Sequence, residues 1–466
     1  MIEKIISLTN DALYSYVLII LLVLCGIYFT VRTRFAQFRL LGEQFRCVTE
    51  KTDKNGVSSF QALMVSTASR VGTGNIIGVA TALCLGGFGS VFWMWAIAII
   101  GASSAFVEST LAQIYKKRGK DGCYGGPAYY IEAATKKKGL AITFAIFLVL
   151  TYGFGFNMLA SYNLQSTFSS YSFYNKASTP WIIGFIIAVL VGYCLIGGGK
   201  RIISVTSFLV PIMGAIYIVV ALVISIINIK LLPDIFKQIF IGAFDFKAIF
   251  GGFSGSCIML GIKRGLYSNE AGVGSAPNAS ASADISHPAK QGFVQMLSVF
   301  IDTLLICTAT AFMCMTSGIT PPTSSDQAAA YVQNALSATL GKAGPIFITV
   351  AMILFAFTTL LGNLFYVDKT INYLLGKEPS KKFKNICYII ASLLIFIGAG
   401  LSADLLWGIA DITMGGMTII NIPIIIYLGK YAIRALKDYE SKRKENKEIS
   451  FKAKDIDLPH QTDYWN

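Results

Sequence analysis

Charged residues are scarce in this chain, because only 14% of its 466 residues are Asp, Glu, Lys or Arg. Soluble domains have about a quarter. Long stretches carry no charge at all, such as 14–31 and 141–175. About 20 apolar residues suffice to cross the hydrocarbon core of a bilayer. The composition therefore predicts an all-α, multi-pass membrane protein with the lipid bilayer as its main solvent, and excludes an ordinary soluble enzyme.

Histidine and paired cysteines are also lacking. The chain has two histidines and nine cysteines, none of which forms a CxxC pair. This pattern excludes a zinc site and a disulfide framework. Paired acids, a catalytic histidine set and a nucleophile elbow are missing too, so we expect no enzyme. The net charge of +14 comes from short clusters between apolar runs, which argues against a nucleic-acid partner.

The apolar runs predict eleven transmembrane helices, at 13–32, 58–85, 89–115, 140–167, 180–198, 202–229, 246–274, 291–315, 344–372, 385–405 and 408–431. Lysine and arginine gather in alternate loops, for example at 116–120 and 136–138, whereas the other loops hold few. Cytoplasmic loops collect these residues. We therefore expect a plasma (inner) membrane protein with its N-terminus outside and its C-terminus in the cytoplasm.

This count divides the chain into five segments: an extra N-terminal helix, a cytoplasmic loop, two five-helix repeats and a polar tail, at 1–35, 36–57, 58–229, 230–434 and 435–466. The tail is rich in Lys and Glu, and we expect it to be frayed or disordered. No obligatory protein partner is evident from the loops, which are too short for a separate domain.

Two of the expected helices contain residues that disfavour a continuous helix. One has Gly72-Thr73-Gly74-Asn75, and the other has a glycine-rich stretch, Gly255–Gly265, followed by Ser268-Asn269-Glu270. Unwound backbone survives inside a bilayer only where it lines a cavity or binds something. The N–H groups at such a break attract a carboxylate, and its carbonyls suit a hard cation such as Na+.

The alternative is that these glycines only let neighbouring helices pack closely. The position of the two stretches favours a binding site. If the first span is set aside, they fall in helices one and six of ten. An inverted five-plus-five repeat with broken core helices places its breaks in these two helices.

Five segments carry a resemblance to a known family: RVGTGNIIGVATA, GGFGSVFWMW, GGPAYYI, GIKRGLYSNEAGVGSAPNASA and HPAKQGFVQMLSVFIDTLLICTATA. They resemble the alanine or glycine:cation symporters of the amino acid–polyamine–organocation superfamily, from about residue 58 to 435. The resemblance implies a fold of the leucine-transporter type and import of alanine or glycine with sodium. In some members the substrate is glutamine.

The resemblance also implies roles for residues. Substrate contacts are expected at the two breaks and on the third core helix, from Thr73, Gly74, Asn75, Ser161, Gly255, Ser268 and Asn269. Sodium is expected at Gly72 and at Thr358 and Thr359, which stand where such folds place two hydroxyls. In isolation, these two hydroxyls could equally bond to their own helix.

The chain departs from the family pattern at four positions near the expected cavity. Ala160 and Tyr162 replace residues that usually bear amides, and Asn363 and Asp368 fall where the family has Trp and a Tyr-rich string ending in Glu. The choice of amino acid, its enantiomer and the roles of these four residues stay open.

Ionisable residues within spans are costly and point to function. We expect Arg70 to pair with Glu108 or Asp302, and Lys263 and Arg264 to lie near the cytoplasmic end of core helix six as an inner gate or anchor. No acid lies within either break, which favours sodium over proton coupling. The sequence thus predicts an alternating-access symporter for a small neutral amino acid. The alternatives are glutamine or another neutral amino acid, proton coupling, or an amino-acid sensor.

Overall fold

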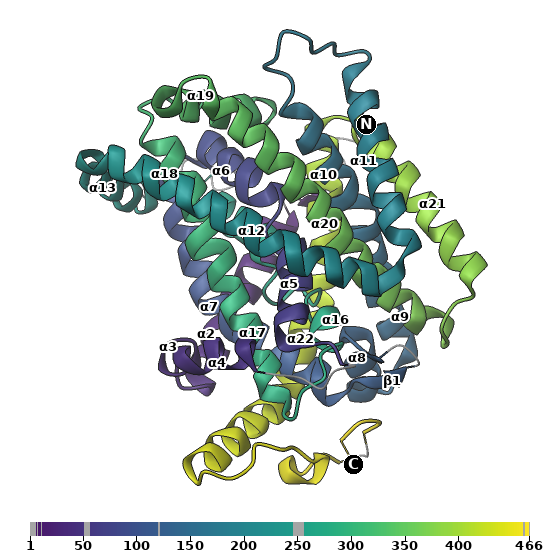
Figure 1. Cartoon of the computed structure of the whole chain (residues 1–466). Helices are drawn as coiled ribbons and strands as arrows, with labels where there is room; N and C mark the ends of the chain where they lie inside the picture. Colours follow the sequence, from purple (N-terminus) through teal and green to yellow (C-terminus); the bar gives the residue numbers. More distant parts are fainter. Residues whose placement is uncertain are drawn as a thin grey trace.

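The computed structural model describes residues 6, 8–10, 12–50, 56–119, 122–245, 256–459 and 462–465. The chain is a bundle of helices with one small hairpin (Figure 1). The first half contains η1 (Leu13–Leu18), α2 (Ile19–Arg32), α3 (Ala36–Arg39), α4 (Leu41–Thr49), α5 (Ser59–Arg70), η2 (Gly74–Gly78), α6 (Val79–Gly86), α7 (Gly89–Ile114), β1 (Lys117–Gly119), β2 (Gly122–Tyr124), α8 (Pro127–Thr135), α9 (Lys138–Leu148), η3 (Val149–Gly155), α10 (Phe156–Ser166), α11 (Thr179–Ile196) and α12 (Gly198–Ile227).

The second half continues with η4 (Ile229–Leu231), α13 (Leu232–Ala243), α15 (Cys257–Asn269), α16 (Pro277–Ser280), α17 (Pro288–Val299), η6 (Phe300–Cys307), α18 (Thr308–Met315), η7 (Ser325–Gln327), α19 (Ala328–Leu340), α20 (Ala343–Leu375), α21 (Lys381–Gly398), α22 (Ala403–Lys444) and η8 (Ala453–Ile456). The strands pair antiparallel, with Lys117 opposite Tyr124. Figure 1 shows α3, α4, α8 and the tail at one end of the bundle, here called the basic face, and α13 and α19 at the other end, here called the opposite face.

Seven helical stretches of the described residues are long and apolar enough to cross a membrane: 89–114, 138–166, 179–196, 198–227, 288–315, 343–375 and 403–444. Each of them overlaps one or two of the expected spans. Shorter apolar helices cover 19–32 and 74–86. The chain is thus a helical, multi-pass membrane protein, and the exact count of eleven stays a prediction.

Helices α11, α12 and α21 carry rows of exposed apolar side chains, among them Phe185, Leu190, Ile216, Ile389 and Leu393. In water such a surface would be unstable, but in a bilayer it faces acyl chains. Helix α7 has the opposite character, because most of its length is buried between α2, α15 and α17. It therefore forms the centre against which the interrupted segments pack.

Two glycines of α15 serve close packing. A Cβ on Gly261 would come within 2.4 Å of the Ser90 carbonyl oxygen, and one on Gly265 within 2.9 Å of Ile97. Both residues lie inside a continuous helix against α7. The expectation of a break within Gly255–Gly265 is therefore wrong for these two positions, because backbone proximity and not unwinding requires the glycines. Gly255 itself lies outside the described residues.

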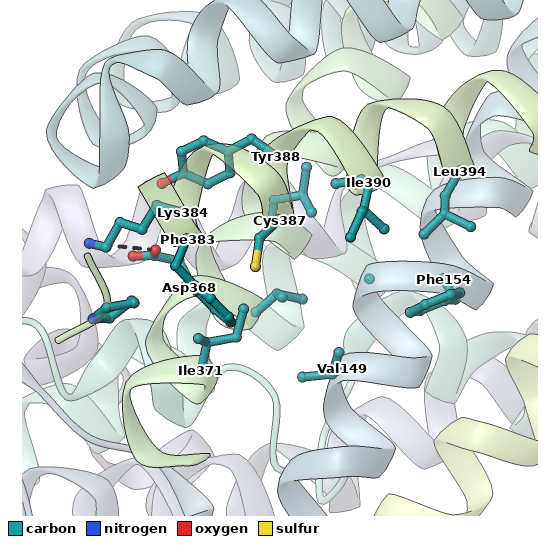
Figure 2. Close-up of a pocket in the computed structure, with 15 residues that line it drawn as sticks. Val149, Phe154, Asp368, Ile371, Phe383, Lys384, Cys387, Tyr388, Ile390 and Leu394 are labelled. Carbon is teal, nitrogen blue, oxygen red and sulfur yellow. Dashed lines mark ion pairs between the residues drawn. The ribbon is translucent and has the colours of Figure 1, made fainter. Parts of the chain in front are cut away.

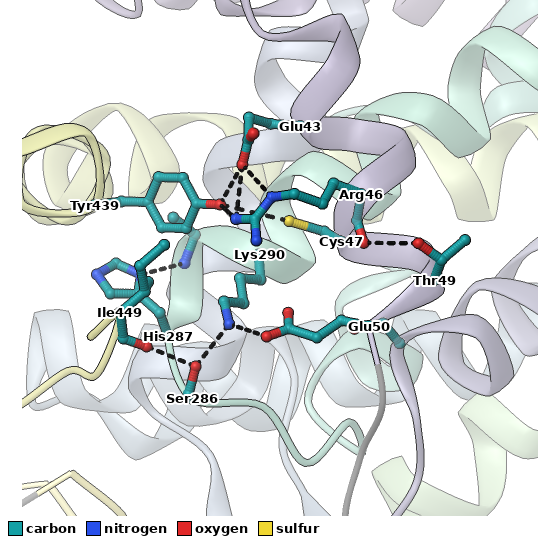
Figure 3. A network of polar contacts seen from close by, with 12 residues as sticks. Glu43, Arg46, Cys47, Thr49, Glu50, Ser286, His287, Lys290, Tyr439 and Ile449 are labelled. Carbon is teal, nitrogen blue, oxygen red and sulfur yellow. Dashed lines mark hydrogen bonds and ion pairs between the residues drawn. The ribbon is translucent and has the colours of Figure 1, made fainter. Parts of the chain in front are cut away.

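A polar network ties the basic face together (Figure 3). The Tyr439 hydroxyl donates to Glu43 at 2.6 Å and accepts from Arg46 at 2.6 Å. Nearby, the Lys290 ammonium donates to Glu50 at 2.5 Å. These contacts join α4, the start of α17 and the end of α22. Helix α22 has 42 residues and is about 60 Å long, so it projects beyond a hydrocarbon core of about 30 Å.

The expectation of a frayed tail is wrong, because its last described residues dock under α7. The Trp465 indole N–H donates to the Gln113 carbonyl at 2.7 Å, and the Tyr464 hydroxyl donates to Asp284 at 2.7 Å. The Lys116 ammonium lies 3.8 Å from the centroid of the Tyr464 ring. Tyr464 and Trp465 therefore anchor the tail. The Lys and Glu content of the tail did not predict this docking.

His287 caps α17 as a neutral imidazole. Its Nδ1 accepts from the Ala289 N–H at 3.1 Å, and its Nε2 is 3.0 Å from the Asp438 carboxylate. Burial lowers the pKa of His287 below its usual value of 6.5. The unfolded chain therefore binds more protons than the folded protein near and below that value, so stability falls as the pH falls.

Replacing His287 by Asn keeps a capping oxygen but removes the titrating group. Between pH 7.5 and pH 5.5, we expect the melting temperature of the detergent-solubilised wild type to fall more steeply than that of His287→Asn. The difference arises because only the wild type takes up a proton at position 287 on unfolding in this pH range. Scanning fluorimetry at several pH values measures it. Parallel curves for the two proteins would contradict the role given to His287.

Candidate functional site

The first expected break is present. Helix α5 ends at Arg70, Val71 and Gly72 are not helical, and the chain becomes helical again from Thr73. The Gly72 N–H would bond to the Ala68 carbonyl in a continued helix, but it donates to the Asn75 side-chain oxygen at 2.8 Å. The Ala68 carbonyl is thereby released from the helical pattern. The break exposes a carbonyl end and, directly after it, the start of a helix.

The second break lies after α15, at the Ser-Asn-Glu-Ala-Gly segment. The helix ends at Asn269, and Glu270, Gly272 and Gly274 all have positive φ, at 55°, 85° and 90°. The Asn269 side-chain oxygen accepts from the Ala271 N–H at 3.0 Å and stabilises this turn. Asn269 is thus placed at the break as expected, with its amide used to shape the backbone.

Asp302 joins the two breaks. The Asn75 side-chain amide donates to one carboxylate oxygen of Asp302 at 2.6 Å. The Ser268 hydroxyl donates to the other oxygen at 2.8 Å. Asp302 is fully buried and comes from η6, a widened helical turn in the chain after α17. The expectation that no acid lies within either break is wrong, because Glu270 lies in the second break. Asp302 is a further acid, which reaches both breaks from a different helix.

The expected ion pairs of Arg70 are not formed. Its guanidinium donates to the Gln295 side-chain oxygen at 2.9 Å, and among the described residues it makes no ion pair with Glu108 or Asp302. Its Nε and Nη2 atoms are buried and have no hydrogen-bond partner there. Glu108 accepts from the Asn421 amide at 3.0 Å. In place of the expected ion pair, Arg70 bonds to the amide side chain of Gln295, and Glu108 bonds to that of Asn421.

The polar side chains around the first break come from α10 and α15. The Thr73 hydroxyl accepts from the Asn163 amide at 3.2 Å. Gly74 lies under the Tyr267 ring, where a Cβ would come within 2.6 Å of a ring carbon. The Ser161 hydroxyl is buried and has no partner among the described residues. Thr73, Gly74, Asn75, Ser268 and Asn269 are thus brought together, and Ser161 lies two residues from Asn163 on the same helix.

The sequence reasoning missed Asn163 and Tyr267. The missing amides at 160 and 162 suggested a changed site, yet Asn163 supplies an amide one position further on. Ala160 is fully buried and Tyr162 is half-buried. An amide within an apolar helix was the available signal for Asn163. Tyr267 gave no signal, because only the packing of α15 on the break brings its ring to Gly74.

Of the two expected sodium ligands on α20, only Thr359 faces the break. Its hydroxyl oxygen is buried and has no hydrogen-bond partner in the described part of the chain, and a Cβ on Gly72 would lie 1.8 Å from it. The Thr358 hydroxyl donates to the Leu354 carbonyl of its own helix at 3.0 Å. Thr359, the backbone of Gly72 and the released carbonyl end of α5 therefore offer oxygen atoms to a hard cation.

Asn363 and Asp368 have separate surroundings. The Asn363 side chain accepts from the Ser69 hydroxyl at 2.7 Å and donates to Asn157 at 2.9 Å, beside the first break. Asp368 instead lies 3.8 Å from Lys384 at an apolar cavity of about 230 Å³ (Figure 2). Asn363 is therefore close to the site, and Asp368 belongs to a different region.

Lys263 and Arg264 lie toward the opposite face. Lys263 is 2.8 Å and Arg264 3.5 Å from the Asp411 carboxylate. They line a cavity of about 360 Å³ together with residues such as Ser325 and Asp404. We expected Lys263 and Arg264 at the end of the bundle that carries the basic loops. This expectation is wrong, because both residues lie toward the other end. The cause is the course of α15, whose first residue, Cys257, contacts the Gly242 carbonyl of α13.

Aromatic rings separate this cavity from the first break. The Arg264 guanidinium lies 3.7 Å from the Trp407 ring centroid, and Trp407 packs on Tyr267 at 4.8 Å. Tyr267 in turn packs on Phe156 at 4.5 Å and covers Gly74. An ion-pair cluster and three rings in edge-on and tilted contact thus lie between the opposite face and the site.

Several known proteins are similar to this chain over most of its length. The model of the sodium:alanine symporter family matches residues 1–453. The chain is 42% identical to the amino-acid carrier protein AlsT of Bacillus subtilis, covering 99% of this chain and 97% of that protein. It is also 42% identical to the probable sodium/glutamine symporter GlnT of the same organism, covering 97% and 93%. The sodium/alanine symporter AgcS of Methanococcus maripaludis is 35% identical, covering 95% and 98%.

Substitution of the two threonines tests the cation site. Sodium stabilises the protein if it binds the folded state, so the melting temperature should rise with its concentration. In Thr359→Val, we expect the sodium concentration for half of this rise to increase about tenfold, which corresponds to about 1.4 kcal/mol. Thr358→Val, which loses only a bond within its helix, should stay within about twofold. Equal changes in the two variants would remove Thr359 from the site.

The variants Gly72→Ala and Gly78→Ala provide a second test of the cation site. The methyl group in Gly72→Ala would occupy the place of the Thr359 hydroxyl, whereas that in Gly78→Ala would sit at an ordinary 3.7 Å from Trp407. The first variant should lose the sodium response, and the second should keep it. Choline chloride at equal ionic strength serves as the salt control.

Proposed function

The chain belongs to the sodium:alanine symporter family, and we propose that it imports a small neutral amino acid, alanine or glycine, with sodium by alternating access. The family consists of transporters, so the chain is not an enzyme. The observation that carries the proposal is the meeting of two interrupted helices at Asp302, Asn75 and Ser268.

The two breaks offer complementary ends to a zwitterion. The second half of the first broken helix begins at Thr73 and Gly74, where the positive end of the helix dipole favours the substrate carboxylate. The substrate ammonium group would face Ser268 and the oxygen atoms around Asp302. Gly74 and the Tyr267 ring leave little room for a side chain, which favours alanine or glycine over a larger substrate.

Sodium would bind between α5 and α20, at Thr359, Gly72 and the carbonyl end of α5. Such a site lies directly behind the backbone that holds the substrate carboxylate. Binding of the cation would therefore order the break before the amino acid arrives. Thermodynamic linkage then requires that sodium raise the affinity for substrate by the same factor as substrate raises that for sodium.

Alternating access needs a closure on each face. On the opposite face, the ion pairs of Lys263 and Arg264 with Asp411 and the Trp407 and Tyr267 rings form one closure. On the basic face, the Asp284 N–H donates to the Val57 carbonyl at 2.8 Å and joins the segments next to the two broken helices. We place the N-terminus outside and the C-terminus in the cytoplasm of a plasma-membrane protein, as the basic loops predict.

Glutamine is the second candidate substrate. The chain is as similar to the sodium/glutamine symporter as to the amino-acid carrier, at 42% identity each. Asn363 is small and polar and lies beside the first break, where it could bind a substrate amide if Tyr267 moved. For either substrate, we propose an inverted five-plus-five repeat with core helices one and six interrupted.

Uptake by proteoliposomes tests the proposal. With a sodium gradient directed inward, we expect labelled alanine or glycine to accumulate above its external concentration, because the gradient supplies the driving force. Replacing sodium by choline should reduce uptake to the level of empty vesicles. Labelled glutamine added in parallel separates the two candidates. Uptake that never exceeds equilibration would contradict symport, and uptake of glutamine alone would contradict the small-substrate assignment.

Asn75→Ala tests the site itself. The substitution removes the bond that shapes Gly72 and the bond to Asp302. We expect uptake to fall at least a hundredfold, because two buried charge-assisted or structural bonds are lost at the substrate-binding break. Size-exclusion profile and melting temperature in detergent show whether the variant is folded. Near-normal uptake by a folded Asn75→Ala protein would exclude this break as the binding site.

A further inference from the structure

The buried centre contains more negative than positive charge. Glu108, Glu270 and Asp302 are each fully buried, and Arg70 is the cation that interacts with all three electrostatically. Among the described residues, none of the three carboxylates forms an ion pair. Unpaired buried charges are very costly. Three carboxylates against one guanidinium therefore leave two negative charges that need cations or protons.

Glu270 is the carboxylate with the most unusual backbone. It has φ of 55°, in the left-handed region that costs a residue with a side chain about 1 kcal/mol or more. Glycine would adopt this conformation without that cost. A glutamate at such a position, fully buried and directly in the second break, indicates that its carboxylate is needed there.

Oxygen atoms surround the Glu270 carboxylate. The Ser69 hydroxyl donates to it at 2.8 Å from the end of α5, and the Ser275 hydroxyl at 2.7 Å from the second break. The Tyr152 and Tyr366 rings pack against each other at 5.3 Å beside it. Both phenol oxygens are buried. The Tyr152 phenol interacts with the Glu270 carboxylate and the Ser275 hydroxyl, and the Tyr366 phenol interacts with Glu270 and the Ser69 hydroxyl.

This arrangement has the chemistry of a small cation site. One carboxylate, two serine hydroxyls and two buried phenol oxygens are hard ligands, and the Asn363 side-chain oxygen is 2.7 Å from Ser69. Tyr152 comes from η3 and Tyr366 from α20, whereas Ser69 and Ser275 belong to the two interrupted segments. A cation bound here would hold both broken helices against η3 and α20.

We propose that Glu270, with Ser69, Ser275, Tyr152 and Tyr366, binds a second monovalent cation, a sodium ion or a proton, during transport. The inference rests on the proposed symport function. It adds a coupling site to the one at Thr359 and Gly72, on the other side of Ser69 along α5. Release of this cation would leave an unscreened carboxylate between the broken helices and so favour their separation from η3 and α20.

The neighbouring ionisable groups leave Glu270 as the centre of this site. Among the described residues, Arg70 from α5 supplies an opposite charge that acts on Glu270, and Glu108 from α7 acts as a like charge. The remaining titratable neighbours are the phenols of Tyr152, Tyr267 and Tyr366. Since free phenols titrate near pH 10 and are uncharged at neutral pH, Glu270 and Glu108 are the two acidic groups of this cluster.

The test compares the cation stoichiometry of wild type and Glu270→Gln in proteoliposomes. Each is clamped at a set membrane potential, and the substrate gradient that stops net flux is measured under separate sodium and pH gradients. We expect the wild type to move two cations per substrate and Glu270→Gln to move one. If the second cation is sodium, the lost dependence is on the sodium gradient. If it is a proton, the lost dependence is on the pH gradient.

Asp368→Asn is the matched control, because it also converts a carboxylate within a long membrane helix to an amide but lies beside Lys384, away from the site. It should keep the stoichiometry of the wild type. Wild-type transport with a single cation at every pH would overturn the proposal, as would two cations in Glu270→Gln. Failure of the wild type to couple any amino acid to sodium would instead contradict the symport function itself.

Ser275→Ala and Tyr152→Phe keep the proposal testable if Glu270→Gln does not fold. Each removes one of the proposed ligand oxygens and leaves the Glu270 carboxylate in place. We expect the concentration of the second cation that gives half-maximal uptake to rise about fivefold or more in each variant. The response to the first sodium ion, identified by Thr359→Val, should change by less than twofold. If both folded variants respond to both cations as the wild type does, the proposed cation site at Glu270 is wrong.

Discussion

Backbone that is unwound inside a bilayer has to find partners within the protein, and this constraint shapes the whole centre of the chain. The first break is stabilised by its own Asn75, which bonds back to Gly72 and forward to Asp302. The second is stabilised by Asn269 and by the Glu270 carboxylate. Each break therefore relies on side chains from other helices, and the two cannot form independently.

This dependence explains why the buried centre is polar. The hydrogen-bond donors to Asp302 come from η2, α15 and η6, and those to Glu270 come from α5 and the second break. Moving one of these segments therefore alters the hydrogen bonds of a buried acid. At such a site, a change in the backbone of the breaks changes the hydrogen bonds that stabilise the buried carboxylates. The proposed cations would then be part of the structure that substrate recognises, and their arrival and release would move the interrupted helices.

The two faces of the bundle are closed by different means. The opposite face has buried ion pairs at Asp411 and aromatic rings in edge-on and tilted contact. The basic face has a wider polar network and a docked tail, with Tyr439, Glu43 and Trp465 as fixed points. The greater number of polar contacts on the basic face follows from its position in water, outside the apolar part of the helices.

The sequence by itself determined the membrane class, the family and the first break, because scarce charge, long apolar runs and Gly72-Thr73-Gly74-Asn75 are local properties of the chain. It did not determine the partners of Arg70, the docked tail, the place of Lys263 or the role of Asp302. The sequence also did not locate the second break. Gly261 and Gly265 serve close packing, but in the sequence they cannot be distinguished from glycines that interrupt a helix. Only tertiary structure decided these points, because each depends on which helices lie side by side, and residues such as Asn75 and Asp302 are more than two hundred positions apart.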